Sequence, residues 1–68
     1  MENTFGSKLK ELRKEKGLGQ IELAKELGVG KSIISLWEKD SCEPTLSKLI
    51  QIAKFFSVTI DYLAGLED

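Results

Sequence analysis

Residues 20–39 read QIELAKELGVGKSIISLWEK, two short amphipathic segments separated by Gly28-Val29-Gly30. Apolar spacings of three and four predict a helix on each side of this turn. Ala24 is a small residue midway along the first segment, where a second helix can cross closely. Gly28 allows the positive φ that ends a helix. We expect the crossing to be held by inward-pointing side chains: Leu23, Val29, Ile34 and Trp37.

A short turn with glycine between two steeply crossed helices is typical of the helix-turn-helix unit, whose second helix fits the major groove of DNA. The same pattern also fits an ordinary pair of helices in a small bundle. The small residue, the glycine and the inward apolar positions occur together at these offsets, which favours the DNA-binding interpretation. We therefore place a helix-turn-helix unit at about residues 20–38.

The flanking sequence predicts three further helices and no strands. The first has its apolar stripe at Phe5, Leu9 and Leu12, with Asn3 or Thr4 as its N-cap and Gly17 as its stop. The other two cover about residues 46–56, after Pro44 and a Thr45 cap, and 60–64. The shared face of the 46–56 helix is expected to hold Leu46, Leu49, Ile50, Ala53 and Phe56. The fold class is therefore all-α, with five short helices in a single domain over residues 1–68.

Length and composition exclude several kinds of site. A chain of 68 residues buries only about 60% of its unfolded surface, which leaves little room for an enclosed active site. There is no histidine, and Cys42 alone forms neither a disulfide nor a cysteine zinc site. We expect no enzyme activity, no metal, no cofactor and no small-molecule ligand. Cys42 is interpreted as an incidental loop thiol rather than a redox sensor, because no resolving partner is near it in sequence.

The remaining composition favours a cytoplasmic protein with an uneven charge. No apolar run approaches the roughly 20 residues of a membrane span, and residues 1–4 lack a secretory pattern. The net charge is −1. Residues 1–39 hold eight basic and six acidic residues, a net of +2, whereas residues 40–68 hold two and five, a net of −3. This asymmetry is compatible with one basic face turned toward a polyanion.

A set of residues between about Phe5 and Gly65 matches a known pattern. They are Leu9-Lys10-Glu11-Leu12-Arg13, Gly17-Leu18, Gln20, Glu22-Leu23-Ala24, Leu27-Gly28-Val29, Ile34-Ser35, Trp37-Glu38, Glu43-Pro44-Thr45 and Asp61-Tyr62-Leu63-Ala64-Gly65. In these residues the chain resembles the lambda-repressor-like helix-turn-helix proteins of the Cro/XRE family. The resemblance implies a five-helix fold, with Ile21 to Leu27 as the positioning helix and Lys31 to Glu38 as the recognition helix.

The resemblance also implies roles for single residues. Those expected to contact bases are Lys31, Ser32, Ser35 and Leu36, and those expected to contact phosphates are Gln20, Lys39 and Ser41. Lys31 would donate to guanine O6/N7 or to a phosphate, and Leu36 would contact a thymine methyl. Gln20 is also expected to cap the positioning helix. Arg13 and Glu38 are expected to form a largely buried ion pair that orients the recognition helix.

The chain departs from the family pattern where DNA contacts are made. Gly19 and Gly30 stand where hydroxyl or amide caps are usual, which removes possible phosphate contacts. Residues 39–42, KDSC, replace a segment that is often basic, and we expect Asp40 and Glu43 to repel the DNA backbone. Fewer phosphate contacts mean weaker binding and a shallower dependence on salt. The sequence therefore predicts modest affinity for a monomer and dependence on a partner subunit.

The 46–56 helix has more apolar positions than one core face needs: Leu46, Leu49, Ile50, Ile52, Ala53, Phe55 and Phe56. Either neighbouring helices wrap around it, or the C-terminal third forms a self-complementary dimer interface. The candidates for that interface are Ile50, Phe55, Ile60 and Leu66. A two-fold dimer would place two recognition helices about 34 Å apart, which predicts a pseudo-palindromic site.

These features lead to one main functional interpretation and one alternative. The first is a sequence-specific regulator of transcription that binds double-stranded DNA as a homodimer, a repressor of phage or mobile-element type. The alternative is a protein-interaction module, an antitoxin or anti-repressor that uses Leu36, Ile33 or Phe55 to bind another protein. For Leu36 and Ile33, contact with a thymine methyl, a protein-partner surface and tolerated exposure all stay open. Trp37 and Tyr62 are assigned to the core.

Overall fold

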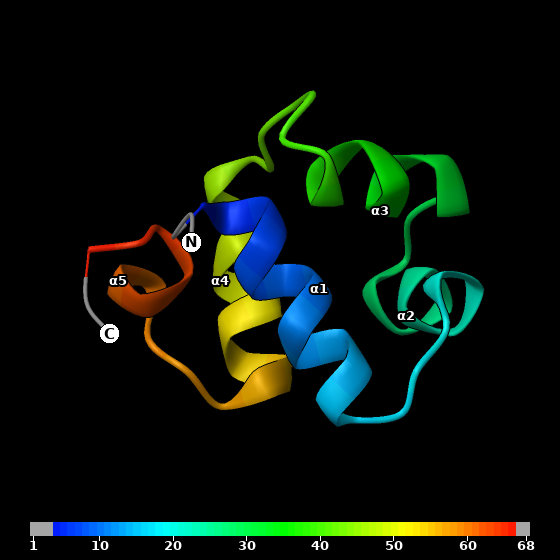
Figure 1. The fold of residues 1–68 in the computed structure, drawn as a ribbon, viewed down its shortest axis with the longest axis horizontal. Helices are drawn as coiled ribbons and strands as arrows, with labels where there is room; N and C mark the ends of the chain where they lie inside the picture. The colour runs from blue at the N-terminus through cyan, green and yellow to red at the C-terminus, as the bar shows by residue number, and fades with distance from the viewer. Residues whose placement is uncertain (1–3, 67–68) are drawn as a thin grey trace.

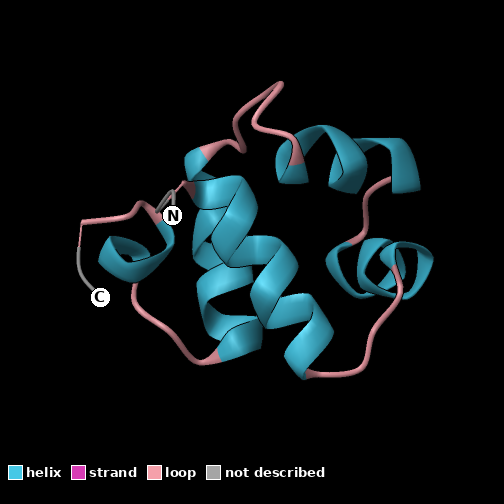
Figure 2. Cartoon of the chain, viewed as in Figure 1, coloured by secondary structure: helices cyan, strands magenta, loops and turns pink. Residues whose placement is uncertain are grey.

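The computed structural model describes residues 4–66, all of whose regular elements are helices (Figure 2). They are α1 (Phe5–Glu15), α2 (Gln20–Leu27), α3 (Lys31–Glu38), α4 (Leu46–Phe56) and α5 (Ile60–Leu63). The predicted all-α class with five helices is confirmed, and α5 ends one residue earlier than expected, with Ala64 as its C-cap. Residues 1–3 and 67–68 of the expected 1–68 domain, including the candidate cap Asn3, lie outside the described residues. Within 4–66 no helix is long and apolar enough to cross a bilayer.

Local hydrogen bonds explain where the helices begin and end. Thr4 caps α1: its hydroxyl accepts from the backbone N–H of Ser7 at 3.1 Å, and the Ser7 hydroxyl accepts from Thr4 N–H at 3.2 Å. Thr45 caps α4 through its hydroxyl, which accepts from Lys48 N–H at 3.2 Å. Gly28 ends α2 with φ 70°, in the left-handed region where a β-carbon is unfavourable. The predicted caps Thr4 and Thr45 and the glycine stop of α2 are confirmed.

The core is formed by all five helices. Its buried apolar members are Leu9, Leu12, Leu23, Ala24, Leu27, Ile34, Trp37, Ile52, Ala53, Phe56 and Leu63. Trp37 is buried as predicted, while Val29 and Tyr62 are half-buried and pack against this core. Each helix therefore contributes at least one buried side chain to the core, and helices this short are marginal without such packing.

The predicted core face of α4 is partly wrong. Leu46 and Ile50 are 68% and 38% exposed, whereas Ile52, which the prediction omits from that face, is fully buried. The buried stripe runs through Leu49, Ile52, Ala53 and Phe56, and Leu46 and Ile50 lie at its edge. Positions 49, 52, 53 and 56 follow the spacing of one helical face, so Ile52 is the residue that completes it.

The helices place α3 at the periphery. α2 packs against α3 and α4, and α1 packs against α3 and α5. In Figure 1, α2 and α3 lie together on one side of α1 and α4, and α5 lies on the other side. The contact between α1 and α5 includes Lys8, which is buried and whose ammonium sits 4.2 Å from the centroid of the Tyr62 ring. The arrangement leaves one long side of α3 without covering protein.

A glycine near the start of α1 allows that helix to approach the end of α3. A β-carbon on Gly6 would come within 2.6 Å of the Trp37 carbonyl oxygen and 2.7 Å of the Glu38 carbonyl oxygen. The Gly6 N–H donates to the Asp40 carboxylate at 2.8 Å. Asp40 itself has φ 58°, a left-handed conformation uncommon for residues other than glycine. The first turn of α1 thus holds both the end of α3 and Asp40, two residues beyond it.

Candidate nucleic-acid interface

α3 has one face in the core and one face in solvent. Ile34 and Trp37 are buried, and Ile33 is half-buried against the core. The residues expected to contact bases share the outer side: Lys31 and Ser32 are exposed, Ser35 is half-buried and Leu36 is 40% exposed. Four side chains within two helical turns are therefore available to a partner.

The turn before α3 is held by backbone and side-chain hydrogen bonds. Val29 N–H donates to the Ala24 carbonyl at 3.0 Å, which closes the end of α2. The Leu27 carbonyl accepts from Lys48 Nζ at 2.8 Å and from Gln51 Nε2 at 3.3 Å, both on α4. Because α4 supplies donors to a helix end that would otherwise be unsatisfied, the turn is fixed to the body of the protein.

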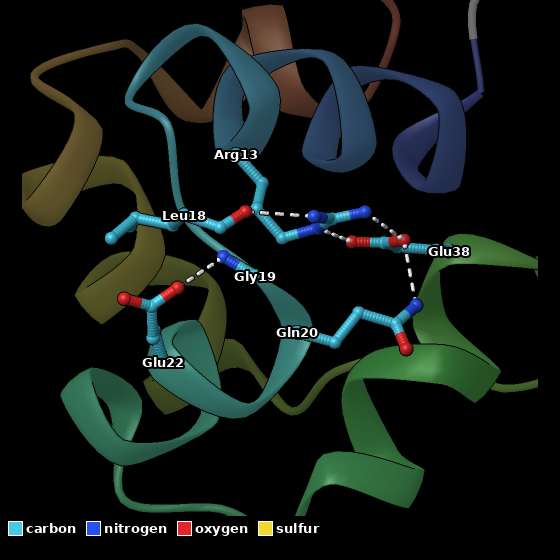
Figure 3. Close-up of polar contacts among 6 residues, drawn as sticks. All are labelled: Arg13, Leu18, Gly19, Gln20, Glu22 and Glu38. Carbon is cyan, nitrogen blue, oxygen red and sulfur yellow. Dashed lines mark hydrogen bonds and ion pairs between the residues drawn. The ribbon is translucent and has the colours of Figure 1, made fainter.

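The ion pair expected from the resemblance is present between α1 and α3 (Figure 3). Arg13 Nε donates to Glu38 Oε2 at 2.6 Å, and Nη2 donates to Oε1 at 3.2 Å, so the contact is bidentate. Arg13 Nη1 donates to the Leu18 carbonyl at 2.8 Å. The two side chains are 10% and 4% exposed. The last residue of α3 is therefore fixed to α1 and to the segment before α2.

Gln20 extends this network into α2. Its Nε2 donates to Glu38 Oε1 at 3.1 Å, as the dashed line in Figure 3 shows. The expectation that Gln20 caps α2 is wrong: the N-cap is Gly19, and Gln20 is the first residue of the helix. At this N-terminus the Gly19 N–H donates to the Glu22 carboxylate at 2.7 Å. Sequence reasoning missed the contact between Gln20 and Glu38, because their spacing of 18 residues gives no periodic signal.

The other residues expected near phosphates flank α3. Lys39 is exposed at the C-cap, and Ser41 is exposed with its N–H bonded to the Leu36 carbonyl at 2.9 Å. At the other end, the N-cap Gly30 makes no side-chain hydrogen bond, as expected for glycine. Asp40 is exposed, but its Oδ1 is bonded to Gly6 N–H. Part of its charge is therefore directed at the start of α1, where a helix favours an anion.

The described residues contain no group of three or more His, Cys, Asp or Glu side chains that could hold a metal ion. A cavity of about 490 Å³ lies between the start of α1 and the loop before α4. Its lining is Thr4, Phe5, Asp40, Cys42, Glu43, Pro44, Leu49 and Ala64. Because none of the four outward residues of α3 lines it, the cavity is separate from that face.

Two curated regulators are similar to this chain. The HTH-type transcriptional activator BcrR of Enterococcus faecalis is 45% identical over 94% of the chain. The cryptic phage CTXphi transcriptional repressor RstR of Vibrio cholerae is 41% identical over 90% of the chain. The chain spans 31% of the activator and 55% of the repressor, so it corresponds to about half of such relatives or less.

A solved structure and a family profile, like these relatives, are of the helix-turn-helix kind. The P22 c2 repressor, determined in complex with a synthetic operator, superimposes with a TM-score of 0.89 at 29% identity. The superposition covers 97% of this chain and 100% of that one. A profile described as helix-turn-helix matches residues 9–63, which contain α2, α3 and the Arg13–Glu38 pair. The chain therefore belongs to the helix-turn-helix family and is a lambda-repressor-like helix-turn-helix protein.

Proposed function

We propose that the chain is a sequence-specific regulator of transcription that binds double-stranded DNA through α3 in the major groove. The observation that carries the proposal is the division of α3 into an outer face with Lys31, Ser32 and Leu36 and an inner face fixed by Trp37 and Glu38. A helix held in this way presents its outer side chains to base edges without shifting relative to the rest of the domain. The similarity to an operator-bound repressor and to a phage repressor favours repression of phage or mobile-element type. It also favours DNA over a protein as the partner.

The proposed contacts follow from the chemistry of the exposed groups. Lys31 donates to guanine O6/N7 or to a phosphate, and the Ser32 and Ser35 hydroxyls bond to base edges. Lys39 and Ser41, after α3, face the phosphates. Gln20 has one amide N–H on Glu38, which leaves its second N–H for a phosphate.

The first test is selection from random duplexes at low salt, followed by substitution of Lys31. We expect a pseudo-palindrome to be enriched. Lys31→Gln is expected to raise Kd about tenfold, within the range for a good base contact. If Lys31 binds a phosphate instead, the slope of log Kd against log salt falls by about 0.9, the value for one phosphate that the variant no longer neutralises.

Lys54→Gln is the matched control for this test. Lys54 is exposed in the last turn of α4, and that end of α4 lies away from α3 in Figure 1. Its replacement removes the same charge and is expected to leave Kd and the salt slope unchanged. The proposal fails if no sequence is enriched, or if the two lysine variants weaken binding equally.

We further propose that the chain binds its operator as a homodimer through the edge of α4 and the residues after α5. Ile50 and Leu66 are 38% and 76% exposed, so they are free to meet a second copy. Phe55 and Ile60 are half-buried and pack against the core, and the Phe55 ring lies 4.9 Å from the Phe56 ring. Among the candidates, the exposed pair therefore contributes most to the interface, and Phe55 and Ile60 contribute mainly to the fold.

Ile50→Glu tests the dimer without disturbing the core. We expect the variant to be folded and monomeric by light scattering, with far-ultraviolet circular dichroism like that of the parent chain. Its affinity for a two-half-site operator should fall to that for a single half-site. Ile21→Glu is the control, because Ile21 is 57% exposed on α2 and should leave the mass unchanged. A dimeric Ile50→Glu protein would place the interface elsewhere.

A further inference from the structure

The outer face of α3 has few groups that distinguish bases by hydrogen bonds. It carries Lys31, two serines and Leu36, and it has no Arg, Asn or Gln. Arginine is a main bidentate reader of guanine, and asparagine and glutamine are those of adenine. The amide of Gln20, at the start of α2, is bonded to Glu38. Lys31 and short hydroxyls alone leave much of a half-site unspecified.

Leu36 is the exposed apolar side chain on this face. It is 40% exposed and lies four residues after Ser32, so the two share one stripe, a single turn apart. Ile33, three residues before Leu36, is half-buried against the core, and Trp37, the next residue, is buried. The core is therefore complete without the outer part of Leu36, which has apolar surface available to a partner.

The major groove offers one apolar group to such a side chain, the 5-methyl of thymine. Cytosine methylated at C5 carries the same group in the same place, whereas uracil and cytosine lack it. One turn of α3 rises about 5.4 Å, and base pairs are about 3.4 Å apart. A methyl that contacts Leu36 therefore lies within about two base pairs of the edge that Ser32 contacts.

We infer that Leu36 is a specificity-determining residue that reads a pyrimidine 5-methyl group in each operator half-site. The inference rests on the proposed function and adds the chemical feature that is recognised. The Leu36 side chain makes an apolar contact with the methyl group and forms no hydrogen bond to the base. A 5-methylcytosine at that position is therefore bound more tightly than unmodified cytosine.

The test uses the selected operator with each thymine of one half-site replaced in turn by deoxyuridine. At one position we expect uracil to weaken binding about fourfold, the effect of burying one methyl group. Leu36→Ala is expected to bind the thymine and uracil duplexes equally. At the same position, 5-methylcytosine should bind about fourfold more tightly than cytosine, and only when Leu36 is present.

Leu46→Ala is the control, because Leu46 is 68% exposed on α4 and the substitution is the same. Its ratio of thymine to uracil affinity should equal that of the parent chain, whatever happens to overall affinity. The inference is overturned if no thymine shows the effect, or if the effect survives in Leu36→Ala. Absence of any DNA binding by the parent chain overturns the proposed function as well, so the two failures are distinguishable.

Discussion

Glu38→Ala is expected to destabilise the folded chain by about 3–5 kcal/mol, the cost of leaving one member of a buried ion pair without its partner. Arg13 would keep only the Leu18 carbonyl as an acceptor, at a site where its side chain is 10% exposed. The Gln20 amide would lose its acceptor as well. A domain of 68 residues is stable by about 3–10 kcal/mol in all. The expected loss is therefore a large share of the total stability.

Urea titration followed by circular dichroism measures this loss, with two variants for comparison. Glu26→Ala removes an exposed carboxylate from α2 and should change the free energy of unfolding by less than about 0.5 kcal/mol. The double variant Arg13→Met/Glu38→Leu removes both charges and should recover much of the stability. A Glu38→Ala protein that lost less than about 1 kcal/mol would show that the pair adds little to the fold.

Gly6→Ala is expected to destabilise the fold by about 2–3 kcal/mol, although alanine is the better helix former by about 1 kcal/mol. The new β-carbon would lie 2.6 Å from the Trp37 carbonyl oxygen and 2.7 Å from that of Glu38. Both oxygens belong to the backbone at the end of α3 and cannot swing away as a flexible side chain would. α1 and α3 must therefore separate, which also moves the outer face of α3.

Thermal unfolding and operator binding together test this expectation. Gly30→Ala is the matched change, since its β-carbon would meet only the Ser32 hydroxyl at 3.8 Å. It should cost less than about 1 kcal/mol, the effect of a poorer N-cap. Gly6→Ala should show both a lower Tm and weaker operator binding at a temperature where it is still folded. A Gly6→Ala protein as stable as the parent chain would mean that α1 and α3 separate at little cost.

The sequence predicts most of the fold because its signals are local. Apolar spacing locates the helices, Thr4 and Thr45 supply caps, and Gly28 supplies the left-handed residue that ends α2. The Arg13–Glu38 pair follows from the family resemblance and not from spacing. On α4, which apolar residues face inward depends on how neighbouring helices are placed. The pattern therefore misplaced Leu46 and Ile50 and missed Ile52.

The contacts that the sequence did not indicate join residues far apart in the chain. A glycine is needed at position 6 because the carbonyl oxygens of residues 37 and 38 lie 2.6 and 2.7 Å from where a β-carbon would be. The available signal was a glycine inside a predicted helix, which is unfavourable unless something approaches closely. Asp40 was expected only to repel DNA, but its left-handed backbone turns the carboxylate onto Gly6 N–H. The charge is still present near α3, but it also has a role in the fold.

The Arg13–Glu38–Gln20 network holds α3 in place without using the residues on its outer face. Stability of the fold and choice of binding partner therefore depend on different residues. The side chains that anchor α3 lie on its inner side and at its last residue: Ile33, Ile34, Trp37 and Glu38. The four outward positions, 31, 32, 35 and 36, make none of the side-chain hydrogen bonds or ion pairs described above. Substitutions there are free to accumulate while the scaffold keeps its stability. On the proposed function, a few point changes at these positions would give the chain a new target sequence, and it could be redesigned in the laboratory by the same route.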